Sequence, residues 1–332
     1  MNHKFHIFTS CNIAYLPQAM VLLKSVRKHH NDCLFSLVLV EEKRHFPKSI
    51  DAALSNFDQV IYPEDVWGEE RFGNLFPYNV VEACTAIKGP ALSKLLEQDL
   101  PVIYLDPDTV IFDRLDAVLH CVGSSSVVLT PHQLDPISPD RWGGIHDERV
   151  SLLTGVFNFG FFAVAPTEEG KSFSKWWDFR TTTYSFDLPE LGLFTDQKWG
   201  NLVPVLFPRT HILRHRGMNV ASWNLHERVV QVSEVGSYLV DGDPLIFFHF
   251  TKGQNGVQPV LQKAIHNNYV ASLWRWYLEE LNEERRALPN NDWSYARYRD
   301  GEQQLIEQHS RREFRSVGRQ SAYTGNPFYQ YR

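Results

Sequence analysis

Short apolar segments alternate with stretches of helical hydrophobic spacing over the first hundred residues. The apolar runs of strand length are Phe5–Thr9, Leu34–Val40, Phe57–Tyr62 and Val102–Leu105. The helical stretches between them include Tyr15–His30 and Pro90–Gln98. Strands that alternate with helices form parallel sheets covered by helices. We therefore expect an α/β fold with a mixed, mostly parallel, Rossmann-like sheet flanked by helices.

Length and charge narrow the class of protein. The 332 residues suffice for one large α/β domain with appendages, and the net charge of −6 argues against a nucleic-acid partner, which requires a basic surface. Four widely spaced cysteines form no C-x-x-C pair, so we interpret them as reduced thiols. No apolar run reaches the roughly 18 residues of a membrane-spanning helix, and the expected location is cytoplasmic.

The strongest candidate for a functional motif is an aspartate pair that follows the strand at Val102–Leu105. Asp106-Pro107-Asp108 would lie at the carboxyl edge of the sheet, where ligands bind in such folds. Carboxylate oxygens hold Mg²⁺ or Mn²⁺, which neutralises charge on a departing diphosphate. The alternative is a plain Asp-Pro-Asp turn.

The rest of the chain continues the pattern and then changes. Further strands are expected at Ser126–Leu129, Asn158–Val164 and Leu245–Phe250, with helices at Gly170–Arg180 and Asp196–Val203. From Tyr269 the chain becomes rich in Trp and Arg, and after Pro289 it is polar. We expect a catalytic domain at 1–268, with a nucleotide-binding half at about 1–112 and a sugar and acceptor half at about 113–268. Residues 269–332 would form a C-terminal helical extension.

Taken in order, the motifs resemble those of GT-A glycosyltransferases, in particular family 8 or a related bacterial family. The aspartate pair resembles their D-x-D motif. The other matching segments are Phe8–Asn12 with Tyr15, Lys88–Pro90, Phe157–Gly160, Thr195–Gln197 and Phe248–Gly253. The last segment has Lys252 at a position that is variable or Gly in family 8, and the following Lys-Pro-Trp is missing.

The resemblance implies a role for each matching residue. It implies a metal site at Asp106, Asp108 and His249. It implies donor contacts from Thr9, Ser10, Tyr15, Lys88, Asp106 and Lys252. It implies catalytic roles at the sugar for Asn158, Asp196 and Gln197. Each residue type also has an ordinary role: Thr9 and Ser10 as helix caps, His249 as a packed strand residue, Asp196 as an N-cap, and Lys88 and Lys252 as surface lysines.

The implied function is metal-dependent transfer of a hexose-type sugar from a nucleotide diphosphate, with UDP the expected carrier and Mn²⁺ or Mg²⁺ the expected cofactor. The acceptor would be a glycan, a lipid-linked saccharide or a protein, in the synthesis of a bacterial surface polysaccharide or glycoconjugate. The polar and aromatic segment Arg214–Arg228 is a candidate acceptor or phosphate contact. Two alternatives are a haloacid-dehalogenase-like phosphatase and a binding protein without turnover. About 100 residues precede the aspartate pair, which disfavours the phosphatase.

The C-terminal extension combines aromatic and basic side chains. It holds Trp274, Trp276, Tyr277, Arg311, Arg312, Arg315 and Arg319. Residues 311–332 contain five Arg and one acidic residue, a local charge of +4 in an acidic chain. A peripheral contact with an anionic membrane would use these charges. The alternative is that the extension folds back on the acidic domain or pairs subunits.

Overall fold

A seven-stranded sheet forms the centre of the protein in the computed structural model, which describes residues 3–43, 46–68, 73–141, 148–251, 268–288, 292–299, 304–316 and 326–329. The strands are β1 (Phe5–Cys11), β2 (Cys33–Leu39), β3 (Gln59–Ile61), β4 (Val102–Leu105), β6 (Val127–Pro131), β7 (Phe157–Val164) and β10 (Thr210–Ile212). Their order is β10-β6-β7-β4-β1-β2-β3, and only β7 runs antiparallel to its neighbours. The mixed, mostly parallel sheet predicted from the sequence is confirmed.

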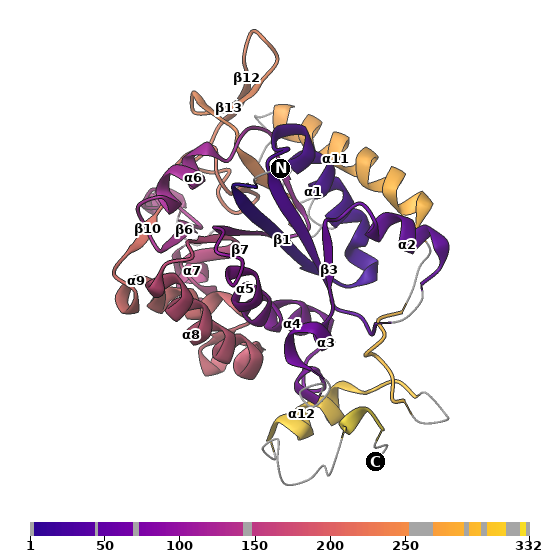
Figure 1. The fold of residues 1–332 in the computed structure, drawn as a ribbon. Helices are drawn as coiled ribbons and strands as arrows, with labels where there is room; N and C mark the ends of the chain where they lie inside the picture. The colour runs from indigo at the N-terminus through magenta and orange to yellow at the C-terminus, as the bar shows by residue number, and fades with distance from the viewer. Residues whose placement is uncertain are drawn as a thin grey trace.

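Helices cover both faces of this sheet (Figure 1). The helices before the aspartate pair are α1 (Leu16–His29), α2 (Lys48–Leu54), α3 (Pro63–Trp67), α4 (Val80–Ala86) and α5 (Lys88–Leu96). Those after it are α6 (Asp116–Val122), α7 (Glu148–Thr154), α8 (Glu168–Tyr184), α9 (Val203–Leu206), α11 (Asn268–Ala287) and α12 (Gln308–Ser316). Three-residue 3₁₀ turns occur at η1 (Ile13–Tyr15), η3 (Pro139–Arg141), η4 (Pro189–Leu191) and η7 (Pro327–Tyr329), and a longer one at η5 (Gln197–Leu202).

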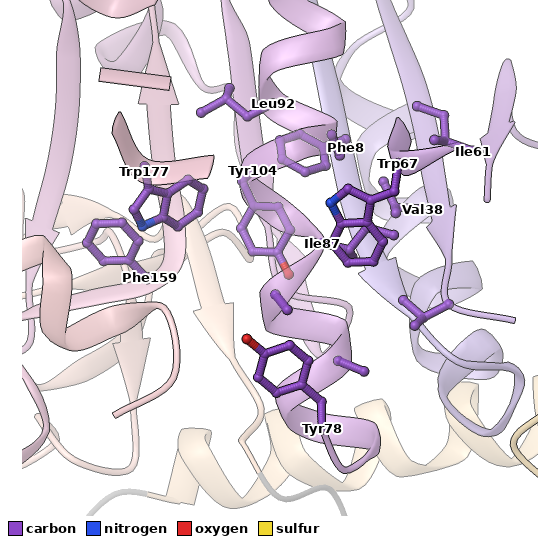
Figure 2. Packing of buried hydrophobic residues seen from close by; sticks show 14 of the residues in the cluster. Phe8, Val38, Ile61, Trp67, Tyr78, Ile87, Leu92, Tyr104, Phe159 and Trp177 are labelled. Carbon is purple, nitrogen blue, oxygen red and sulfur yellow. The ribbon is translucent and has the colours of Figure 1, made fainter. Parts of the chain in front are cut away.

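The alternation of side chains along the strands divides the core into two layers. Phe8 and Tyr104 pack toward α4, α5 and α8 in one cluster, which also holds Trp177 (Figure 2). Ile7 and Ile103, one residue earlier on the same strands, pack toward α1, α2 and α6 in the other cluster. Because β4 is buried on both faces, its sequence is a continuous apolar run rather than an alternating one.

Smaller sheets complete the domain. The first joins β11 (Val220–Ala221), β15 (Phe247–His249) and β5 (Thr109–Ile111), with β15 between the other two. The second is β12 (Val230–Val232), β13 (Tyr238–Val240) and β14 (Asp243–Pro244). The third pairs β8 (Asp187–Leu188) with β9 (Leu193–Phe194).

Some predicted boundaries differ from the structure. The helix expected from Pro90 begins two residues earlier, at Lys88, which faces the carboxyl edge of the sheet. The helix expected over Asp196–Val203 is the 3₁₀ turn η5, followed by the short α9. A Cβ on Gly200 would lie 2.1 Å from the ring of Phe159, so the chain passes too close to the sheet for an ordinary amphipathic helix.

The C-terminal extension folds back on the domain. Helix α11 packs along α1, where Lys24 pairs with Glu284 at 2.5 Å (Figure 1). Trp274 and Tyr277 of α11 are buried, whereas Trp276 is 36% exposed. Among the described residues, no helix is both long and apolar enough to cross a membrane.

Two of the arginines expected to carry the basic character of the extension are turned inward. Arg311 is 3% exposed and donates to the carbonyl oxygens of Phe76, Tyr78 and Tyr295 at 2.6–2.8 Å. Arg315 bonds to the carboxylate of Glu82 at 3.4 Å. For these two residues the structure favours the fold-back alternative over a membrane surface. Arg312 is exposed, and Arg319 lies outside the described residues.

Candidate active site

The aspartate pair lies where the carboxyl ends of β1, β4 and β6 meet the start of the antiparallel β7. The Asp106 amide donates to the Gly160 carbonyl at 2.8 Å, and the Thr109 amide donates back to the Asp106 carbonyl at 3.0 Å. The Phe250 amide holds the Asp108 carbonyl at 2.8 Å. The chain therefore makes the expected turn, but the turn is fixed between two sheets and directs both carboxylates to one point.

A histidine from β15, in the sheet β11-β15-β5, joins the two carboxylates. His249 Nε2 lies 3.0 Å from Asp108 Oδ1 and 3.7 Å from Asp106 Oδ2. One ligand atom from each of the three residues lies within 4.8 Å of the others. Two oxygens and an imidazole nitrogen suit Mn²⁺ or Mg²⁺, with Mn²⁺ better matched to the nitrogen. The alternative role for His249, a packed strand residue, does not explain why its ring lies beside two carboxylates.

Close packing around the candidate metal ligands requires glycine at position 160. A Cβ there would lie 2.5 Å from His249 Cε1, 2.7 Å from Asp106 Oδ2 and 2.7 Å from Asn158 Oδ1. These three residues therefore leave no room for a side chain at position 160. By their donor chemistry, Asp106, Asp108 and His249 fit a divalent cation.

A buried lysine connects the aspartate pair to a third carboxylate. Lys88 Nζ lies 3.1 Å from Asp106 Oδ1 and 3.0 Å from Asp196 Oδ2, and it is almost wholly buried. It also donates to the Phe159 carbonyl at 3.3 Å, and the Tyr104 hydroxyl donates to Asp106 Oδ1 at 2.6 Å. Lys88 is therefore not a surface lysine. The side chain of Asp196 makes no cap hydrogen bond, so the N-cap alternative does not describe it.

Burial and charge act against each other in this network. Burial disfavours the charged form of each group, yet Lys88 and then His249 hold the pKa of Asp106 below its usual range. The two carboxylates outweigh burial at Lys88 and raise the pKa of its ammonium group. Burial dominates at Asp196, whose carboxyl pKa is raised, and Asp108 raises the pKa of His249 against burial. A cation at the site would have to replace the His249 proton.

Two amide side chains lie beside this cluster. Asn158 Nδ2 donates to Gln197 Oε1 at 3.3 Å, and Asn158 Oδ1 accepts from the Gly160 amide at 3.1 Å. Gln197 Nε2 donates to the Thr154 carbonyl at 3.1 Å. Thr195, with φ of 45°, is held in the left-handed region beside them. Strain of this kind persists only where the surroundings impose it, and it is common at binding sites.

The residues predicted to contact the nucleotide differ in how accessible their side chains are. Thr9 is fully buried inside β1, and the Ser10 hydroxyl is used to donate to the Cys84 carbonyl at 2.8 Å. Neither caps a helix. Tyr15 is 44% exposed at the edge of the sheet and is the most available of the three to a base. These roles stay predictions, and Lys252 lies outside the described residues.

Two site residues were not singled out from the sequence as such. His132 Nε2 lies 3.3 Å from Asn158 Nδ2, directly after β6. Trp223 packs edge-on against His249 at 5.2 Å and against His132 at 5.4 Å between ring centroids. A polar residue that follows a predicted strand was the signal for His132. Trp223 belongs to the segment Arg214–Arg228, which forms a wall of the site through this residue.

Comparison with known proteins shows the family. A family model described as nucleotide-diphospho-sugar transferase matches residues 71–269, more than half of the chain. The chain belongs to this family. The match includes the aspartate pair, Lys88, Asn158, Asp196 and His249, so this glycosyltransferase carries its candidate site inside the matched region.

Individual relatives are distant. YfnD of Bacillus subtilis strain 168, whose function is not assigned, is 24% identical over 255 residues, which are 74% of this chain and 77% of YfnD. YfnF of the same strain, also without assigned function, is 26% identical over 153 residues. These residues are 45% of this chain and 48% of YfnF, so the chain spans about half the length of YfnF. The structure of galactosyltransferase LgtC, with donor and acceptor sugar analogues, superposes with a TM-score of 0.51 at 14% identity. The superposition covers 87% of this chain and 98% of LgtC, and it shows a shared GT-A fold.

Proposed function

We propose that this glycosyltransferase uses a divalent cation, bound by Asp106, Asp108 and His249, to transfer a hexose-type sugar from a UDP-linked donor. The observation that carries the proposal is the convergence of these three side chains, each of which places a ligand atom within 4.8 Å of the other two. When bound, Mn²⁺ or Mg²⁺ would neutralise charge on the diphosphate leaving group. The family assignment favours this transfer over the phosphatase alternative.

The protein's own groups would divide the remaining work. Lys88 keeps Asp106 ionised and oriented, and Asp196 shares the same ammonium group. Asn158 and Gln197 present amide groups to the sugar hydroxyls, and Asp196 supplies a carboxylate near the electron-poor centre that glycosyl transfer passes through. Tyr15 would contact the base. We propose a glycan or a lipid-linked saccharide as the acceptor, with a protein as the further possibility that the assay includes.

The test is UDP release from UDP-glucose, UDP-galactose and UDP-N-acetylglucosamine, with Mn²⁺, with Mg²⁺ and with EDTA. Asp108→Asn should lower kcat/KM at least about 100-fold, since a group that acts on the leaving group contributes several kcal/mol. Asp116→Asn, on the exposed side of α6, is the matched control and should keep its activity. Wild-type turnover by Asp108→Asn in EDTA would refute the metal site.

Two further substitutions separate the parts of the site. His249→Ala should weaken metal binding, so that half-maximal activity needs a higher Mn²⁺ concentration. Gln197→Ala should lower kcat while calorimetry shows near-normal UDP binding. Lys252→Ala should raise the donor KM. Normal donor binding and turnover by both His249→Ala and Lys252→Ala would show that this late motif is structural.

A further inference from the structure

A cavity of about 690 Å³ lies apart from the aspartate pair. Its volume is within the range of about 300–1,000 Å³ usual for small-molecule sites. The lining residues used below come from α1, the end of β5, β13 with its preceding turn, and α11: Lys28, Asp113, Phe112, Ser237, Tyr238 and Trp276. We call this the aromatic cavity. Because four elements distant in sequence contribute to it, the tertiary fold determines its shape.

The aromatic cavity and the aspartate pair lie at opposite ends of one small sheet. In the antiparallel pairing of β5 with β15, Thr109 is opposite His249 at the end nearest the aspartates. Ile111 is opposite Phe247 at the other end, and Phe112 follows it into the cavity. Phe112 follows Asp108 by four positions along extended chain, a span of about 13 Å. A ligand in this cavity would not occupy the donor site.

Three aromatic rings from different elements meet at the aromatic cavity. The Phe112 centroid lies 5.6 Å from that of Tyr238 and 5.7 Å from that of Trp276, both in edge-on contacts. Trp274 and Tyr277, on the same helix, are buried in the core, but Trp276 stays 36% exposed. Such rings offer a large apolar face with little loss of side-chain freedom, which suits them to binding.

The polar groups of the cavity are mixed in kind and nearly balanced in charge. Lys28 makes no ion pair within the described part of the chain, and Asp113 Oδ1 accepts a hydrogen bond from the neighbouring Arg114 amide at 2.7 Å. Ser237 and Tyr238 add hydroxyl groups that donate or accept. A diphosphate would need a concentration of positive charge, which one lysine opposite one aspartate does not supply. The cavity suits a neutral ligand with apolar faces and many hydroxyl groups.

We propose that the aromatic cavity binds a neutral oligosaccharide. The C–H faces of its sugar rings would pack on Trp276 and Tyr238, and its hydroxyl groups would bond to Lys28, Asp113 and Ser237. The site would hold part of a glycan remote from the sugar undergoing transfer. The proposal goes beyond the donor chemistry above and does not depend on it, because its readout is binding rather than turnover.

The experiment uses the full chain labelled with 5-fluorotryptophan, whose nine Trp give separate fluorine resonances. Loss of one signal in Trp276→Phe assigns that residue. The probes are linear hexasaccharides of glucose, of galactose and of N-acetylglucosamine, each at about 10 mM, tenfold above a millimolar Kd. At least one should shift the Trp276 signal saturably, while UDP with Mn²⁺ should shift that of Trp223 instead.

Variants decide whether the shift reports the cavity. Tyr238→Ala should weaken hexasaccharide binding at least tenfold in a protein that remains folded and keeps its UDP release. Tyr269→Ala is the matched control. Tyr269 is 46% exposed on α11, the helix that carries Trp276, but it lies outside the cavity lining. Three results would overturn the proposal: no probe shifts the Trp276 signal, Tyr238→Ala binds as tightly as the wild type, or inorganic pyrophosphate produces the same shift.

Discussion

Gly160→Ala would place a single methyl group among three residues of the candidate site. The added Cβ would lie 2.5 Å from His249 Cε1 and 2.7 Å from both Asp106 Oδ2 and Asn158 Oδ1. Ordinary contacts begin at 3.4 Å, so each neighbour would have to move by about 0.7 to 0.9 Å. Gly160 lies within β7 and its φ is not positive, so backbone strain does not contribute.

The effect on activity should be far larger than the effect on stability. Overpacking of a buried site costs about 1–3 kcal/mol of folding free energy, because the neighbours shift to relieve it. A displacement near 1 Å of groups that position a substrate lowers turnover by about 100-fold, equivalent to about 2.7 kcal/mol in the transition state. Because Asp106 and His249 are the residues displaced, the affinity for Mn²⁺ should fall as well.

The assay combines UDP release, a Mn²⁺ titration by calorimetry and urea unfolding. Gly123→Ala is the matched control, since that glycine caps α6 with a φ of −64° and the added Cβ would meet only the carbonyl oxygens of His120, at 3.3 Å, and Leu119, at 3.6 Å. It should keep both activity and metal affinity. If Gly160→Ala retained wild-type turnover and Mn²⁺ affinity, the cluster of residues beside Gly160 would not be the reaction site.

Three other substitutions test the surrounding structure. Arg311→Ala leaves three buried carbonyl groups without their donor and should lower the urea-derived free energy of unfolding by about 3–5 kcal/mol, whereas the exposed Arg312→Ala should change it little. Burial lowers the pKa of His6 to about 4 in the folded chain. Between pH 6.5 and 4 the unfolded chain therefore binds a proton that the folded chain does not bind, and the free energy of unfolding falls as the pH drops through about this range. His6→Gln should remove about 3 kcal/mol of that loss, measured as the difference in unfolding free energy between pH 7 and pH 4. Glu41→Gln should lower the same free energy of unfolding by about 1–3 kcal/mol, because one amide oxygen cannot replace both carboxylate bonds, to the Ile13 and Ser294 amides.

The central sheet could be predicted because its strands carry their own signal. Val102–Leu105 is continuously apolar, and the structure has a strand at those same residues. Phe57–Tyr62 and Leu245–Phe250 were each predicted longer than the strands that form, since hydrogen bonding to a neighbour, rather than apolar character, ends a strand. The two-residue strand β11 and the pairing of β5 with β15 depend on contacts between distant segments and leave no local pattern.

The site was predictable as a list of residues but not as a geometry. Position after a strand pointed to Asp106 and Asp108, and resemblance added His249. Nothing in the sequence indicated that Lys88 bridges Asp106 and Asp196, because that contact joins residues 108 positions apart through burial of an ammonium group. The inward orientation of Arg311 was likewise hidden, since a basic run on a polar segment has the same composition whether it faces solvent or carbonyl groups.

The fold-back of the C-terminal extension has a consequence for synthesis of the chain. Tyr295, Phe314 and Phe328 belong to the same core cluster as Trp177 and Tyr104, on one face of the central sheet. A ribosome releases these last aromatic residues after every strand of that sheet has been translated. Until they emerge, part of that apolar face has no cover from its own chain. A nascent or truncated chain lacking them should therefore be held by chaperones or aggregate, even though its candidate active-site residues are all present.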